Sequence, residues 1–347
     1  MWQNYINATS IDEVIKNFRE KKERARIVAG GTDLILGLER GVKKGIDTLI
    51  DVSRIPTLDQ IIIDEDNIIH LGPLVTHNDC AASKLIRKSA YPLARAAWEV
   101  GAPQIRNRGT IAGNLITASP ANDTITPLMA LGASVTLLST RGERTVPLNE
   151  FYTGVRRSVM QADEMLVDIS FPAMKKSQRG TFIKLALRRA QAISLVNVAI
   201  ILNLKEGTVK SAVITLGAVT PVIGHAEEAE KFLAQKKLNR KNIAQAAELA
   251  MQAAHPIDDV RGSAAYRLEM VKVITARALT TILNETEQDG MPKKPVLLQS
   301  KETTEHELRP RVTFHPRQLK RPLMERTIPS PADIIKHCCV CCAKKAC

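Results

Sequence analysis

The chain has 347 residues, and its 44% apolar and 24% charged content is typical of a globular protein with a sizeable core, which excludes a disordered chain. The formal net charge is +13, but residues 291–347 hold 12 Lys and Arg against 5 Asp and Glu, so much of the excess lies at one end. Aromatic residues make up 3% of the chain, too few for the stacking platforms of single-strand binders, so we expect a solvated basic extension and no nucleic-acid partner.

We expect neither a membrane span nor a secretion signal. No apolar run is long enough to cross a bilayer, and residues 1–7 lack the basic and apolar regions of a signal peptide. Five of the six cysteines lie in the last ten residues, so we expect no disulfide framework in the body, which carries only Cys80. We therefore expect a cytoplasmic protein.

The first half of the chain mixes short strands with helices. Apolar patterns bounded by turn residues predict strands at residues 26–29, 48–52, 61–63, 68–71, 134–139, 144–146 and 165–171. Helical spacing and capping residues predict helices at residues 34–40, 76–86, 92–100 and 121–131.

A polar break at residues 174–179 separates a second region. Strands are predicted there at residues 180–187, 196–204 and 209–216, followed by helices at residues 226–234, 240–253 and 262–284. The apolar face of the last helix predicts that it lies on the sheet. We expect an α+β protein with domains at residues 1–173 and 178–286, then a basic, Pro-rich, disordered tail at residues 290–347.

Two glycine-containing turns are the most informative feature. The first, Gly30–Gly31, lies between a predicted strand and a predicted helix, and the second, within residues 106–114, contains Gly109 and Gly113. Glycine allows positive φ and has no Cβ, so consecutive N–H groups can point at one anionic oxygen, and two such turns could hold a pyrophosphate. The spacing matches neither a Rossmann fingerprint nor a Walker loop, so the first turn alone is equally consistent with a structural turn.

The segment from residue 106 to residue 123 is rich in groups that bind ligands. Asn114, Thr117 and Asp123 add an amide, a hydroxyl and a carboxylate to its glycines. Polar loops beside apolar helices often bind a ligand, and a carboxylate such as Asp123 can accept hydrogen bonds from ribose or ribityl hydroxyls. Asp123 can equally be a helix N-cap.

Together these motifs resemble the FAD-binding subunit of molybdenum hydroxylases, the family of xanthine dehydrogenases and aerobic carbon monoxide dehydrogenases. The resemblance rests on the two turns and on residues 119–123, 127–131, 216–221 and 259–267, in the expected order. It implies a two-part FAD domain similar to that of vanillyl-alcohol oxidases, followed by a small α/β flavoprotein domain. One departure is Ala112, which stands where the family usually has glycine.

The resemblance also implies a set of cofactor-binding residues, and no catalytic or metal-binding residue. The pyrophosphate and adenosine part of FAD would contact Ile27, Val28, Ala29, Gly30, Gly31, Thr32, Asp33 and Leu34. The pyrophosphate and ribityl chain would contact Thr110, Gly113, Asn114 and Thr117, and a ribityl or ribose hydroxyl would contact Asp123. Leu166, Lys184 and Ile193 would lie near the flavin ring, although composition alone favours core positions for Leu166 and Ile193 and surface charge for Lys184.

The implied function is electron transfer. A partner subunit with a molybdenum cofactor would oxidise the substrate, a [2Fe–2S] subunit would carry the electrons, and FAD would pass them to NAD⁺, a quinone or O₂ in a heterotrimer or its dimer. The alternative is a scaffold or binding module without a cofactor, which would dock a partner through the basic tail.

The end of the tail carries the remaining cysteines, Cys338, Cys339, Cys341, Cys342 and Cys347. Overlapping C-x-x-C pairs can bind zinc or cluster iron. No second pair follows at a set distance, so a disordered tail or a truncated reading of a further domain is favoured.

Overall fold

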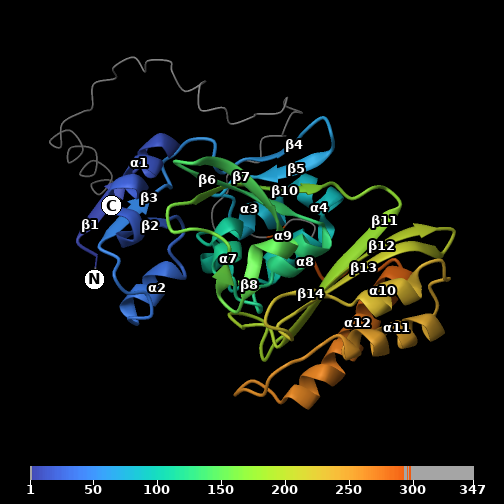
Figure 1. Ribbon diagram of the computed structural model, residues 1–347. Coiled ribbons are helices and arrows are strands. Elements are labelled where there is room, and N and C mark those ends of the chain that lie inside the picture. The colour runs from blue at the N-terminus through green and yellow to red at the C-terminus, as the bar shows by residue number, and fades with distance from the viewer. Residues whose placement is uncertain (1, 293–294, 296, 298–347) are drawn as a thin grey trace, which may run out of the picture. The chain divides into compact units, whose positions relative to one another are not determined.

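The computed structural model describes residues 2–292, 295 and 297. Its N-terminal sheet has three parallel strands in the order β1-β3-β2 (Figure 1). The elements of this part are β1 (Asn4–Asn7), α1 (Ile11–Lys21), η1 (Lys22–Arg24), β2 (Ala25–Val28), α2 (Leu34–Glu39) and β3 (Thr48–Asp51). Parallel strands need crossover connections, and α1 with η1 supplies the one between β1 and β2. The first glycine turn directly follows the carboxyl end of β2.

The second sheet has five antiparallel strands in the order β4-β5-β10-β6-β7. They are β4 (Ile61–Ile63), β5 (Ile68–Leu71), β6 (Ser134–Ser139), β7 (Gly142–Pro147) and β10 (Met165–Pro172). Burial alternates along β6, because only one face of this strand packs on the core. A separate pair is formed by β8 (Tyr152–Gly154) and β9 (Arg157–Ser158).

Short helices fill the space beside the second sheet. They are α3 (His77–Ala82), α4 (Lys84–Ser89), α5 (Tyr91–Glu99), α6 (Pro103–Arg106), α7 (Ile111–Ile116), α8 (Ile125–Ala130) and α9 (Leu148–Phe151). The single helix expected at residues 76–86 is wrong, because Ser83 ends α3 and caps α4, where its Oγ accepts the N–H of Ile86 at 3.3 Å.

The third sheet is antiparallel, in the order β11-β12-β13-β14. Its strands and helices are β11 (Gln178–Leu185), β12 (Val196–Lys205), β13 (Thr208–Gly217), β14 (Gly224–His225), α10 (Glu227–Leu233), α11 (Arg240–Gln252) and α12 (Ala264–Leu283). The expected packing of the last helix on the sheet is confirmed, since α12 contacts β11 and β12. Helices α5 and α8 also contact this sheet, so both faces are covered and the first seven residues of β12 are all buried.

A tight polar contact joins α8 to the third sheet. The hydroxyl of Thr126 donates to Oδ1 of Asn197 at 2.6 Å, and both side chains are fully buried. A Cβ on Gly217 would lie 2.2 Å from the same Asn197 oxygen, so only glycine fits at this position. The third sheet therefore packs directly against the helices of the first half of the chain.

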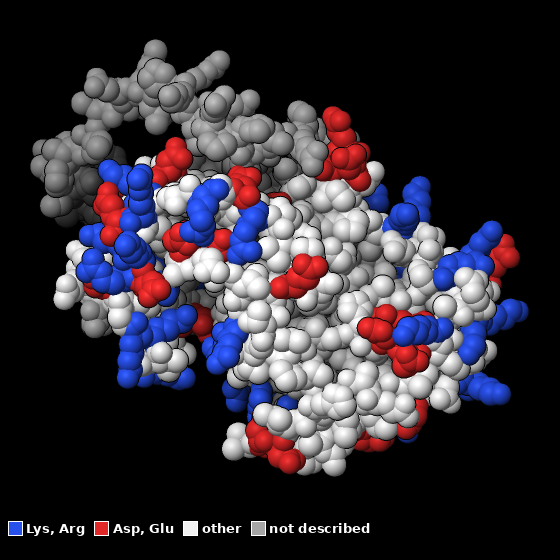
Figure 2. Space-filling model, in the orientation of Figure 1, with Lys and Arg blue, Asp and Glu red and all other residues white. Residues whose placement is uncertain are grey.

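Charges of both signs are interspersed over α1 on the face shown in Figure 2. None of the helices within residues 2–292 is both long and apolar enough to cross a membrane. The tail expected at residues 290–347 lies outside the described residues except for 290–292, 295 and 297, and so do its five cysteines.

Candidate functional site

The two glycine turns are in direct contact. A Cβ on Gly30 would lie 1.8 Å from the carbonyl oxygen of Arg108 and 2.5 Å from its carbon, which leaves no room for any side chain. Gly31 has a φ of 73°, which L residues rarely adopt. The two neighbouring glycines are thus required for different reasons, close approach at Gly30 and backbone conformation at Gly31.

The second turn begins a helix that the sequence analysis did not predict. The hydroxyl of Thr110 caps α7 by accepting the N–H of Gly113 at 2.9 Å. The N–H of His77, the first residue of α3, donates to the carbonyl of Gly109 at 3.0 Å, and Thr76 forms a β-bridge with Thr110. The first turns of α3 and α7 therefore lie side by side, next to the Gly30 contact.

A cavity of about 500 Å³ opens at this junction, a size typical of small-molecule sites. Thirteen of the sixteen predicted residues line it, namely Ile27, Val28, Ala29, Gly30, Gly31, Thr32, Asp33, Leu34, Thr110, Gly113, Asn114, Thr117 and Leu166. Both turns and the central strand β10 therefore line the same cavity. Binding of a ligand by these residues stays a prediction.

Three successive backbone N–H groups in the first turn are free to bind an anion. Those of Gly31, Thr32 and Asp33 donate to no other residue in the part of the chain that the structure describes. Nearby, the hydroxyl of Thr117 donates to the carbonyl of Gly113 at 2.8 Å. Unpaired N–H groups in a glycine turn form a concave anion site.

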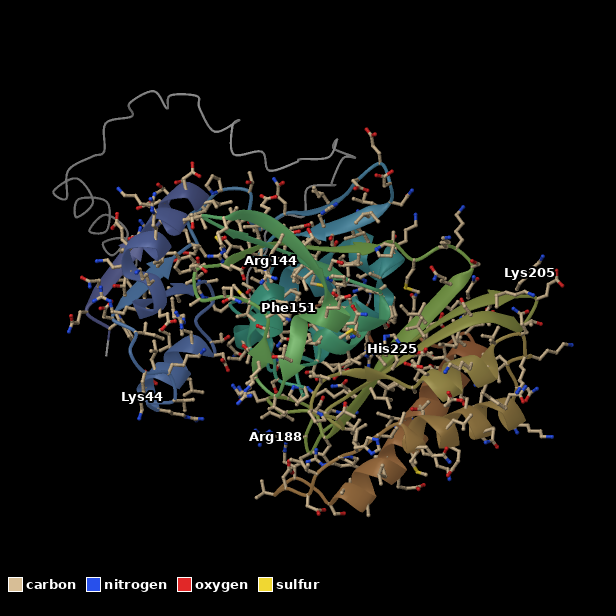
Figure 3. All side chains as sticks on the ribbon, viewed as in Figure 1. Lys44, Arg144, Phe151, Arg188, Lys205 and His225 are labelled. Carbon is tan, nitrogen blue, oxygen red and sulfur yellow. The ribbon has the colours of Figure 1, made fainter. Side chains whose placement is uncertain are left out.

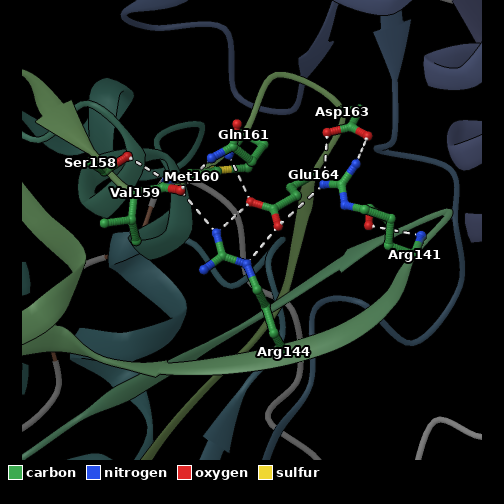
Figure 4. A network of polar contacts seen from close by, with 9 residues as sticks. Arg141, Arg144, Ser158, Val159, Met160, Gln161, Asp163 and Glu164 are labelled. Carbon is green, nitrogen blue, oxygen red and sulfur yellow. Dashed lines mark hydrogen bonds and ion pairs between the residues drawn. The ribbon is translucent and has the colours of Figure 1, made fainter.

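The opposite wall, residues 158–166, is fixed by an ion-pair network (Figure 4). The Arg144 guanidinium binds both oxygens of Glu164, at 2.7 and 2.9 Å, and the N–H of Gln161 donates to Glu164 at 2.7 Å. Arg141 binds the neighbouring Asp163 at 2.5 and 3.1 Å. Burial alone would raise the pKa of Glu164, but the hydrogen bonds from Arg144 and Gln161 outweigh it and lower that pKa. Charged contacts therefore link this wall to Arg141 and Arg144 of the β6–β7 hairpin.

Asp123 and Lys184 lie away from the cavity wall and contact each other. Nζ of Lys184 is 2.6 Å from one Asp123 oxygen and also donates to the carbonyl of Glu99 at 3.1 Å. The Ser194 hydroxyl donates to the other Asp123 oxygen at 2.6 Å. Burial raises the pKa of Asp123. Asp123 was expected to contact a ribityl or ribose hydroxyl, and Lys184 was expected near the flavin ring. In the structure these two side chains bind each other.

Ile193, the third predicted residue away from the cavity wall, lies on the loop between β11 and β12 that also carries Arg188 (Figure 3). Its side chain is 62% exposed. An exposed isoleucine beside Ser194 is available to a ligand or a partner, so the structure does not support the alternative core position. A place for Ile193 near the flavin ring stays a prediction.

Several lining residues were missed by the sequence analysis, among them Phe18, His77, Met160, Gln161 and Glu164. A capping signal for α3 was present, since Thr76 and Asp79 form a capping box. No local signal in the sequence identifies the wall at residues 158–166, because the position of this wall depends on the long-range pairing of β10 with β6.

The cavity offers backbone donors and apolar surface, which suit ligand binding. Among the described residues, no group of three or more His, Cys, Asp or Glu side chains is placed to hold a metal ion. Backbone donors beside apolar surface are the features that an anion flanked by apolar groups requires, and binding of such a ligand stays a prediction.

Comparison with known proteins identifies the two regions. Residues 2–174 match the family model for the FAD binding domain in molybdopterin dehydrogenase, and residues 181–282 match the CO dehydrogenase flavoprotein C-terminal domain. The chain is 32% identical over 283 residues to the 6-hydroxypseudooxynicotine dehydrogenase complex subunit alpha of Paenarthrobacter nicotinovorans, covering 81% of this chain and 94% of that one. It is 31% identical to the nicotinate dehydrogenase FAD-subunit of Eubacterium barkeri, covering 75% and 89%.

Among solved structures, carbon monoxide dehydrogenase from Hydrogenophaga pseudoflava has a chain that superposes with a TM-score of 0.77 at 28% identity, covering 82% of this chain and 98% of that one. The two-domain architecture expected from the sequence is thereby confirmed, and so is FAD as the cofactor. The chain belongs to the family of FAD-binding subunits of molybdenum hydroxylases and is an oxidoreductase subunit.

Proposed function

We propose that the cavity binds FAD with its diphosphate between the two glycine turns and its ring beside the wall at residues 158–166. The observation that carries this proposal is the contact of Gly30 with the Arg108 carbonyl, because it brings the unpaired N–H groups of the first turn next to the second turn. The unpaired N–H groups of Gly31, Thr32 and Asp33 are available to donate hydrogen bonds to an anion. Leu166, in β10, supplies apolar surface on the side of the ring.

We propose a positioning role for the buried pair of Asp123 and Lys184. The Lys184 ammonium and the Asp123 carboxylate lie 2.6 Å apart and bind each other, so neither is free for a direct hydrogen bond to FAD. The same Asp123 carboxylate holds Ser194, the residue next to Ile193. The pair therefore supports the loop on which Ile193 is available to the flavin ring.

We propose that this subunit transfers electrons within a complex that contains a molybdenum-cofactor subunit and a [2Fe–2S] subunit. The support is that its relatives include a dehydrogenase complex subunit and a carbon monoxide dehydrogenase medium chain. FAD held by this chain would supply the redox chemistry for electron transfer between the clusters and an acceptor, which is NAD⁺, a quinone or O₂. The residues of this chain bind and orient the cofactor and exclude water from it.

Reconstitution with flavins tests the proposed site. The purified 347-residue chain is mixed with FAD, FMN or riboflavin and then desalted. We expect one FAD per chain with a flavin absorbance band and weaker retention of FMN and riboflavin, because these lack the full diphosphate and the adenosine. A folded protein that stays colourless with FAD would contradict the proposal and favour a cofactor-free binding module.

The acceptor is tested separately on the FAD-loaded protein. After anaerobic reduction, the flavin is mixed with NAD⁺, a quinone or O₂, and its reoxidation is followed by absorbance. Fast reoxidation by one of the three identifies the acceptor, whereas slow reoxidation by all three would contradict electron transfer to this class of acceptors.

A further inference from the structure

His77 is a buried histidine whose ring the fold leaves without a polar partner. It is the first residue of α3, is 3% exposed and lines the cavity. Its Nδ1 is buried without a hydrogen-bond partner, and its Nε2 makes no hydrogen bond with a residue that the structure describes. Buried polar groups are nearly always paired, so an unpaired ring in a cavity wall points to a ligand.

The ring lies where the two turns meet. Its Cδ2 is 3.3 Å from the point that a Cβ on Gly109 would occupy, and Thr32 Oγ1 is 3.5 Å from that same point. The backbone N–H of His77 also donates to the Gly109 carbonyl at 3.0 Å, which ties the start of α3 to the second turn. A group bound between Thr32 and Gly109 would therefore be a neighbour of this imidazole.

The imidazole is uncharged at neutral pH. Burial lowers its pKa to about 3, and the positive charge of Arg106 adds to this effect. A neutral imidazole has one N–H donor and one acceptor nitrogen. The oxygens of a diphosphate only accept hydrogen bonds, so such a ligand selects the tautomer whose N–H faces it.

We propose that His77 is a ligand-positioning residue whose neutral imidazole donates its N–H to a diphosphate oxygen of FAD between the turns. The proposal rests on the proposed placement of that diphosphate. It adds a side-chain donor to a site otherwise built from backbone N–H groups. Because the imidazole is unpaired before the ligand arrives, binding gains a hydrogen bond without breaking one within the protein.

Substitution separates this role from a structural one. In His77→Leu, which keeps a similar volume, we expect the dissociation constants of FAD and ADP to rise about 10- to 100-fold, as for the loss of one hydrogen bond to a charged group. The thermal midpoint of the ligand-free protein should stay equal or rise, because an unpaired polar group is removed from the interior. A purely structural histidine would lower that midpoint and affect all ligands alike.

Two further variants identify the donor and control for burial. His77→Asn and His77→Gln place an amide near Nδ1 and Nε2 respectively, and one of them should recover part of the lost affinity. Thr275→Val removes another buried, unpartnered oxygen, in α12 and away from the cavity, and should leave FAD and ADP binding unchanged.

Binding of adenosine, which lacks the diphosphate, completes the test. The ratio of the adenosine and ADP dissociation constants should fall about 10-fold or more in His77→Leu, and an unchanged ratio would overturn the inference. In the wild-type protein labelled with ¹⁵N-histidine, ADP should shift one His77 ring-nitrogen resonance, whereas absence of a shift would overturn it without any variant. A wild-type protein that binds neither FAD nor ADP would instead overturn the proposed function itself.

Discussion

Gly30→Ala is the substitution that most sharply tests the contact between the two glycine turns. The added Cβ would lie 1.8 Å from the Arg108 carbonyl oxygen and 3.1 Å from the nitrogen of Gly109. Real Cβ atoms do not approach closer than 3.0 Å, so the two backbones must move apart by at least about 1.2 Å. Both neighbours are backbone atoms, which cannot rotate away as the end of a flexible side chain would.

The size of the effect follows from this displacement. Hydrogen bonds require donor–acceptor distances of about 2.7–3.2 Å, so a shift of this size removes one turn from its anion. A hydrogen bond to a charged group contributes about 1.5–3 kcal/mol, and the loss of two amounts to about 3–6 kcal/mol. We therefore expect FAD to bind at least about 100-fold more weakly, and overpacking to lower the free energy of unfolding by about 1–3 kcal/mol.

Titration of the ligand-free protein with FAD, followed by flavin fluorescence, measures this change. The matched control is Gly224→Ala in β14, where an added Cβ meets nothing within 4 Å and φ is not in the left-handed region. We expect the control to bind FAD within about 2-fold of the wild type. If Gly30→Ala retained full affinity while Gly224→Ala behaved normally, the two turns would not bind the diphosphate jointly.

Two further predictions concern stability. Asp259→Asn should lower the free energy of unfolding by about 3 kcal/mol. The reason is that Arg267, which is 1% exposed, loses the carboxylate that lies 2.6 Å from its Nη2. An unchanged urea midpoint would contradict this prediction. Glu164 has a lowered pKa in the folded protein, so its ionised form stabilises the fold above its usual pKa of 4.5, and this stabilisation is lost as the pH falls through the lower, folded value. Glu164→Gln should thus be less stable than the wild type by about 1 kcal/mol at pH 7, a small effect because Arg144 is 42% exposed and its charge is screened by solvent. The difference in stability should shrink in acid. A difference that does not depend on pH would refute this prediction.

The strands and helices of the C-terminal region were largely predictable from local patterns. The apolar run at residues 198–202 of β12 indicates a strand covered on both faces, and α5, α8 and α12 do cover that sheet. In the N-terminal region, α1 was missed although Ser10 caps it by accepting the N–H of Glu13 at 3.2 Å. That capping residue was visible in the sequence.

The cavity was predictable only in part. Residues 27–34 and Thr110 carry their signal locally, in turns that precede helices, and the structure brings them together. The contact between Asp123 and Lys184 joins residues 61 positions apart, and no local pattern specifies it. His77 likewise acquires its place from the pairing of Thr76 with Thr110, which is a property of the fold.

A crystal structure of the protein with bound FAD tests the central claim most directly. We predict diphosphate oxygens within about 3.2 Å of backbone N–H groups in both turns, at Gly31–Asp33 and at the start of α7, with the ring beside Leu166. A diphosphate bound to only one of the turns, or elsewhere on the protein, would contradict it.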